Sequence, residues 1–188
     1  KTAYEMCGRD WSSDVCSSDL TNTAVGASAL AANGTARYNT AIGYTALNAN
    51  TSGESNTAVG MQALLTNTTG GNNIAVGQGA IGLNTTGSNN TGIGFNALVS
   101  NTTASNNTAV GYQAAYSNTT GAYSVSVGSR ALYTNSTGQE NTAVGFGALE
   151  FNTTGNYNVA QGLYALRSNT TASNNTAVGY QEIGRAHV

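Results

Sequence analysis

The chain has 188 residues, a formal net charge of −2 and only 7% charged residues. Nucleic-acid binding needs clustered Lys and Arg to neutralise phosphates, so this composition argues against a nucleic-acid partner. No apolar run approaches the roughly 18 residues of a membrane-spanning helix, so we expect no membrane contact from this chain.

The two ends differ from the rest of the chain. Residues 1–20 (KTAYEMCGRDWSSDVCSSDL) resemble a translated frame of a short-read sequencing adapter, and residues 182–188 (EIGRAHV) resemble the same adapter entered from its other side. We therefore expect both segments to be artefacts that flank an internal piece of a longer gene. They hold the only Trp, His and Lys, both Cys and every Asp, so these residues support no functional argument.

Residues 21–181 form nine full seventeen-residue repeats and a partial tenth. The first repeat begins at Asn22, and the consensus is N-T-A-V-G-x-x-A-L-x-x-N-T-T-G-x-x. No insertion or deletion interrupts the period. Glycine occupies the fifth position of every copy: Gly26, Gly43, Gly60, Gly77, Gly94, Gly111, Gly128, Gly145, Gly162 and Gly179. Such self-similarity is typical of a solenoid, in which each coil is stable only against its neighbours.

The first positions of each repeat (NTAVG, NTAIG, NIAVG) are short and β-compatible, so they predict one brief strand per coil. Alternation places the second and fourth positions on one face of that strand. Because the second position changes from Thr to Ile74, Val125 and Val159, we expect this face to be buried and the third position, usually Ala, to lie on the other side.

The fixed residues then fall at the fifth, eighth, ninth and twelfth positions, which is helical spacing. This pattern predicts one short α-helical or 3₁₀ turn per coil. A recurring Asn and usually a Thr-Thr-Gly turn close the repeat, and we expect that Gly to adopt the left-handed conformation. The Asn column comprises Asn33, Asn50, Asn67, Asn84, Asn101, Asn118, Asn135, Asn152 and Asn169.

These elements predict a parallel β-solenoid of the β-roll type, in which equivalent side chains stack in rows. Each coil offers only about two large apolar side chains, worth roughly 1.5–3 kcal/mol each, against an ordering cost of about 1–2 kcal/mol per residue. The core is therefore thin, and we expect a second buried face formed by self-association along the solenoid.

The strings NNTAVG (residues 106–111) and SNTAVG (residues 55–60) resemble the NSVAIG signature of YadA-type head repeats in trimeric autotransporter adhesins. The run NTAVGYQAAYSNTTG (residues 107–121) is similar to repeats of bacteriophage tail fibres. The likeness covers residues 22–181, although this coil is longer than that of the adhesin head. The resemblance implies a trimeric β-roll displayed outside the cell, on a cell surface or a virion, that engages a host receptor or matrix.

Catalytic and metal sites are not indicated. The repeats contain no His, Cys, Asp or Lys, and their three carboxylates, Glu54, Glu140 and Glu150, occupy different repeat positions. We expect solvated surface charges, although Glu140 and Glu150 could approach across adjacent coils. Calcium-binding rolls need an Asp in each repeat, and zinc ligands are absent, so we expect no metal and no cofactor.

Two surface features have alternative interpretations. Aromatic residues at the sixth position, Tyr44, Phe95, Tyr112, Phe146 and Tyr180, form either a binding stripe or, as we favour, a lid over the Leu column. The Asn-x-Thr strings, such as residues 67–69 and 118–120, match the N-glycosylation pattern, but stacking of polar side chains explains them better.

We therefore expect a non-catalytic structural and adhesive segment of a surface or virion fibre. One alternative is an ice- or crystal-binding solenoid that uses its Thr column, which would have to be flat and exposed. Another is a polysaccharide-processing β-helix enzyme, which would need acidic clusters that the repeats lack.

Overall fold

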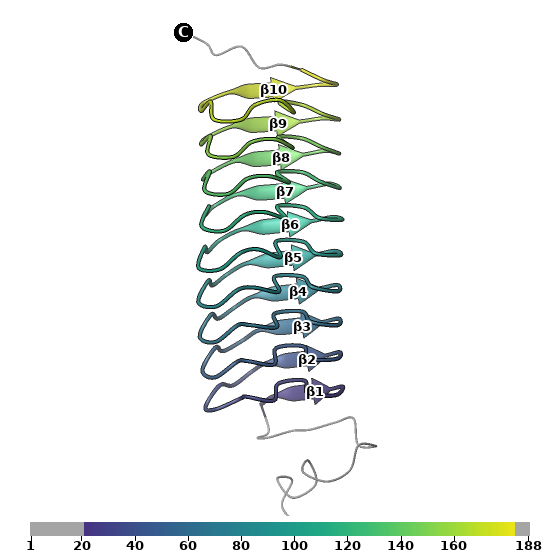
Figure 1. The fold of residues 1–188 in the computed structure, drawn as a ribbon, viewed down its shortest axis with the longest axis vertical. Coiled ribbons are helices and arrows are strands. Elements are labelled where there is room, and N and C mark those ends of the chain that lie inside the picture. Colours follow the sequence, from purple (N-terminus) through teal and green to yellow (C-terminus); the bar gives the residue numbers. More distant parts are fainter. Residues whose placement is uncertain (1–20, 183–188) are drawn as a thin grey trace, which may run out of the picture.

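The computed structural model describes residues 21–182 as a single stack of coils (Figure 1). The residues interpreted as adapter, 1–20 and 182–188, fall outside this range apart from Glu182. Each coil contributes one three-residue strand: β1 (Thr23–Val25), β2 (Thr40–Ile42), β3 (Thr57–Val59), β4 (Ile74–Val76), β5 (Thr91–Ile93), β6 (Thr108–Val110), β7 (Val125–Val127), β8 (Thr142–Val144), β9 (Val159–Gln161) and β10 (Thr176–Val178).

The ten strands form one parallel sheet in sequence order, with an identical register at every step. Each residue pairs with the residue seventeen positions later, so Val25 lies beside Ile42 and Ile42 beside Val59. The prediction of a parallel β-solenoid with seventeen-residue coils is therefore confirmed.

The two faces of the strand are the reverse of those expected from the sequence. The central residue of each strand, usually Ala, points into the coil; Ala41, Ala58 and Ala75 are completely buried. The second and fourth positions point outward instead, and Ile74, Val125 and Val159 are 43%, 38% and 38% exposed. The prediction failed because β-branched residues suit either face of a strand, whereas the narrow interior of the coil admits only small side chains.

The core consists of three columns of side chains inside the coil. Ala at the third and eighth positions and mainly Leu at the ninth pack into a row, in which Leu47, Leu64 and Leu98 have no exposed surface. The same three columns continue as a second cluster in the C-terminal coils. A Leu beside two Ala fills the interior, and a larger residue at either Ala column would overpack it.

The predicted α-helical or 3₁₀ turn is wrong: residues 21–182 contain no helix. The fifth, eighth, ninth and twelfth positions are instead the ends of two successive tight turns. In the second coil the Ala46 N–H donates to the Gly43 carbonyl, and the Asn50 N–H donates to the Leu47 carbonyl. Positive φ angles of 52° at Thr45 and 50° at Leu47 interrupt any helix. Two successive turns, each closed by a hydrogen bond between residues three positions apart, thus reproduce helical spacing in the sequence.

Glycine at the fifth position is required by both conformation and space. These residues have φ between 118° and 135°, a region that residues with a side chain rarely adopt. A Cβ added to Gly111 would lie 2.6 Å from the Gly128 carbonyl oxygen of the next coil. The expectation for the Thr-Thr-Gly turn is wrong, because Gly70 and its equivalents do not have positive φ; the left-handed residue lies two positions later, at Asn72.

Buried asparagines connect successive coils through two columns of hydrogen bonds. At the twelfth position, each side-chain Nδ2 donates to the Oδ1 of the preceding coil, at 2.7–3.2 Å, in seven consecutive steps from Asn67 to Asn169. At the first position, each Asn Oδ1 accepts the backbone N–H of the following coil, as in the 2.9 Å bond from Asn56 to Asn39. Both columns also donate to the carbonyl at the fifteenth position; the Gly70 carbonyl accepts from Asn56 and Asn67. The amide groups of these columns are thereby satisfied, as burial requires, except that Asn33 Oδ1 in the first coil has no partner.

Candidate interaction surfaces

The outer side of the sheet carries most of the exposed large hydrophobic residues of the described chain. Among residues 21–182, thirteen of the eighteen exposed large hydrophobic residues lie at the second, fourth and sixth positions: Ile42, Tyr44, Met61, Ile74, Ile93, Phe95, Tyr112, Val125, Phe146, Val159, Leu163, Val178 and Tyr180. These three columns contain no charged residue. We refer to them as the strand face.

The predicted aromatic stripe forms the border of this strand face. Its members, Tyr44, Phe95, Tyr112, Phe146 and Tyr180, are 57%, 40%, 53%, 44% and 64% exposed. The rings of Phe95 and Tyr112 stack with their centroids 5.5 Å apart. The structure therefore places the stripe on the outside of the coil, next to the fourth position, and interrupts it where Gln78 and Ser129 occupy the same column.

The Thr column at the second position lies on the surface, not in the core. Thr23 and Thr176 are exposed, and Thr40, Thr57 and Thr91 are half-buried. Where this column lacks Thr it has Ile or Val, as at residues 74, 125 and 159. The column therefore keeps a β-branched side chain in every coil but does not keep the hydroxyl group.

A charged cluster joins the seventh, eighth and ninth coils on a different side of the solenoid. Glu150 is 2% exposed, and its carboxylate bonds to Arg130 at 2.9 Å and to Arg167 at 2.6 Å. The expectation of a solvated Glu150 is therefore wrong, whereas Glu54 and Glu140 are exposed. Sequence reasoning missed this cluster because its three members occupy two repeat positions in three coils.

Aromatic rings flank the charged cluster. The Arg130 guanidinium lies 4.5 Å from the Tyr133 ring centroid, and the Arg167 guanidinium lies 4.4 Å from that of Tyr164. Tyr133 in turn stacks on Tyr116, with centroids 5.2 Å apart. Because these planar groups pack on one another from coil to coil, the cluster adds contacts that hold the coils together.

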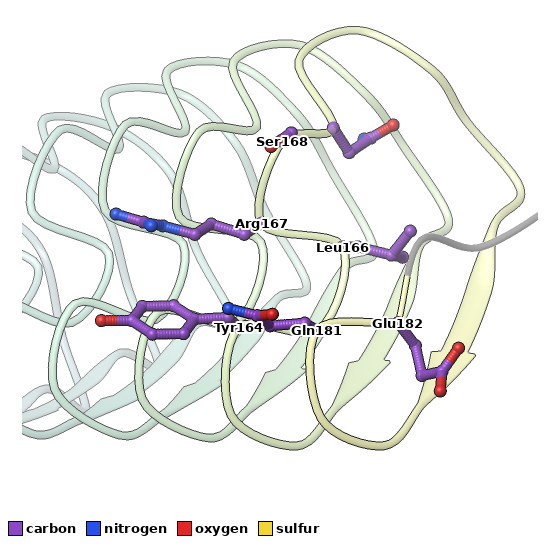
Figure 2. Close-up of a pocket in the computed structure, with 7 residues that line it drawn as sticks. Tyr164, Leu166, Arg167, Ser168, Gln181 and Glu182 are labelled. Carbon is purple, nitrogen blue, oxygen red and sulfur yellow. The ribbon is translucent and has the colours of Figure 1, made fainter.

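One pocket lies at the C-terminal end of the described coils (Figure 2). Its lining includes Tyr164, Leu166 and Arg167 of the ninth coil and Gln181 and Glu182 beyond it. The Leu166 N–H donates to the Glu182 carbonyl at 2.9 Å, as Leu at this position does to Ala in earlier coils. Glu182 occupies the eighth position, where all nine full coils have Ala. The pocket is thus the exposed end of the Leu column and holds no constellation of catalytic groups.

Within residues 21–182, no three His, Cys, Asp or Glu side chains lie close enough to hold a metal ion. The same residues contain no helix long and apolar enough to cross a membrane. Comparison with known proteins finds no matching family, no matching curated sequence and no matching solved structure.

Proposed function

We propose that this chain is a non-catalytic structural segment of an extracellular fibre, built from copies that associate side by side through the strand face. The single observation that carries the proposal is the uncharged strand face, on which exposed large hydrophobic residues recur along the stack among Thr side chains. Contiguous exposed apolar surface of this extent marks an interaction site on soluble proteins.

The dimensions of the strand face suit a protein interface. Ten strands spaced about 4.8 Å apart and a width of about four residues, at about 3.3 Å each, give roughly 45 Å by 13 Å, or about 600 Å² before side chains widen it. A standard interface buries about 800 Å² per partner. One such face is therefore close to the area that a stable association needs.

The constant coil height also favours copies that lie parallel to one another. A second copy has the same rows at the same spacing, so a rotation axis parallel to the solenoid axis keeps every row in phase with its partner row. A closed trimer of this kind is the form that the resemblance to adhesin heads implies. Display on a cell surface or virion, and adhesion to a host receptor or matrix, belong to the same proposal.

The test is the oligomeric state of the full chain, measured by sedimentation velocity and light scattering. We expect the native chain to be a trimer. Val110→Glu, at the centre of the strand face, should give folded monomers, because association would bury an unpaired charge. Ser55→Glu is the matched control, since Ser55 is exposed at the seventeenth position, outside the three columns of this face. A native chain that is monomeric at high concentration refutes the proposed assembly.

A second candidate function is binding to ice or another crystalline surface through the same strand face. The Thr column on the outer side of the sheet favours it, because the regular register spaces successive coils about 4.8 Å apart. The loss of the hydroxyl at Ile74, Val125 and Val159 counts against a role that depends on hydroxyl groups. Thermal hysteresis of the monomeric chain, abolished by Thr91→Lys, would support this candidate; a freezing point that the protein does not alter would exclude it.

A further inference from the structure

Every full coil contains an acceptor pattern for N-glycosylation. The pattern Asn-x-Ser/Thr begins at the twelfth position in all nine coils, and three further copies begin at the seventeenth position, at Asn89, Asn106 and Asn174. The structure divides these twelve sites into groups with different environments. We call Asn50, Asn67, Asn84, Asn101, Asn118, Asn135 and Asn152 the ladder asparagines, and Asn89, Asn106 and Asn174 the corner asparagines. Asn33 and Asn169, in the first and ninth coils, are half-buried and belong to neither group.

Each ladder asparagine already uses its side-chain Nδ2 atom, to which a glycan would be attached, as a hydrogen-bond donor within the fold. Each is at most 2% exposed. The Nδ2 atom of Asn84 donates to Asn67 Oδ1 at 2.7 Å and to the Gly87 carbonyl at 2.9 Å. Even a methyl group on Gly87 would lie 2.5 Å from Asn84 Oδ1. A sugar on Nδ2 would remove one of its two donors and would have no space inside the coil.

The corner asparagines have the opposite environment. Asn89, Asn106 and Asn174 are exposed and lie on the turn that precedes a strand, with φ of 59°, 63° and 62°. Their backbone N–H groups bond to the preceding coil. Within the described residues their side-chain amides make no hydrogen bond, so a glycan there displaces nothing in the fold.

We infer that N-glycosylation and solenoid folding compete for the ladder asparagines. An oligosaccharyltransferase would form a bond between Asn Nδ2 and the anomeric carbon of a lipid-linked diphosphate oligosaccharide. The bond from that carbon to the phosphate oxygen breaks, the lipid diphosphate leaves and the amide loses one proton. On an unfolded chain this reaction at a ladder asparagine blocks the stacking of coils; at a corner asparagine it is compatible with the fold.

The acceptor pattern at the ladder asparagines can be removed without changing the asparagines or their hydrogen bonds. The acceptor pattern needs a hydroxyl two residues after each Asn. In every coil this hydroxyl belongs to an exposed residue at the fourteenth position, and it makes no hydrogen bond within residues 21–182. Replacing these residues by Ala leaves both Asn columns intact. The positions are Ser52, Thr69, Thr86, Thr103, Thr120, Thr137 and Thr154.

The experiment compares three forms of the full chain, each translated behind a cleavable signal sequence into glycosylating microsomes. These are the native chain, the seven-site Ala variant, and a corner variant with Thr91→Val, Thr108→Val and Thr176→Val. Val is chosen because Val125 and Val159 occupy the same column. Mass spectrometry gives the occupancy of each site, and resistance to a non-specific protease separates folded from unfolded glycoforms. Separately, the folded native chain is incubated with a purified oligosaccharyltransferase and a lipid-linked donor.

We expect occupied ladder sites only in protease-sensitive glycoforms, and protease-resistant chains that carry no glycan at any ladder site. The seven-site variant should become largely resistant, whereas the corner variant should not. The folded chain should receive no glycan at any ladder site. A protease-resistant chain with an occupied ladder asparagine overturns the inference. A seven-site variant that is no more resistant than the native chain overturns it too, and so do ladder sites that receive no glycan in microsomes.

Discussion

Replacing one ladder asparagine by alanine should destabilise the chain by about 3–5 kcal/mol. In Asn84→Ala, two hydrogen bonds donated by the side chain are lost, each worth about 1 kcal/mol net. Asn67 Oδ1 is left buried without its donor, which costs about 1–3 kcal/mol more. The Gly87 carbonyl still accepts from Asn73, and the Asn101 amide still donates to Ala104, so these groups add little.

The assay is urea denaturation followed by circular dichroism, with linear extrapolation to water. Asn169→Ala is the matched control: it removes the same two kinds of bond at the half-exposed end of the ladder, where water can replace them. We expect the control to lose about 1 kcal/mol. Equal losses in the two variants, or a loss below about 1 kcal/mol in Asn84→Ala, would refute the view that buried amide bonds hold the coils together.

Three further substitutions test other parts of the fold by the same assay. Gly94→Ala should prevent native stacking, because its Cβ would meet the Gly111 carbonyl oxygen at a φ of 133°, whereas Gly71→Ala, which needs no positive φ, should be tolerated. Leu98→Ala should lower the free energy of unfolding by about 2–5 kcal/mol, because it leaves a cavity in a fully buried column. A smaller loss of stability would mean that neighbouring coils collapse into the cavity. Glu150→Gln should cost about 1–2 kcal/mol, since its half-exposed Arg partners remain solvated, and this loss should shrink at high salt.

The sequence predicted the coil length, the strands and their parallel stacking because these follow from a strict period. It did not predict the direction of the side chains. A strand of the form Thr-Ala-Val is consistent with either face inward, and only the width of the closed coil decides in favour of Ala. Periodicity also could not separate a helical turn from two successive tight turns, because both place fixed residues three and four positions apart.

The candidate surfaces were predictable only in part. The aromatic residues of the sixth position stood out because they recur, but their exposure depended on the orientation of the strand. The contact between Glu150, Arg130 and Arg167 could not be read from one repeat, since it joins different positions of three coils. The aromatic column could be noticed in the sequence because it recurs, whereas the charged cluster occurs once and needed the three-dimensional structure.

The uniform direction of the asparagine bonds makes the two ends of the stack chemically different. At each step the later coil supplies the donor and the earlier coil supplies the acceptor. A chain is synthesised from its N-terminus, so every new coil emerges with free amide donors beside an acceptor that is already in place. A stack that grows from its N-terminus therefore presents its ladder Oδ1 acceptors to the next coil, which brings the matching Nδ2 donor.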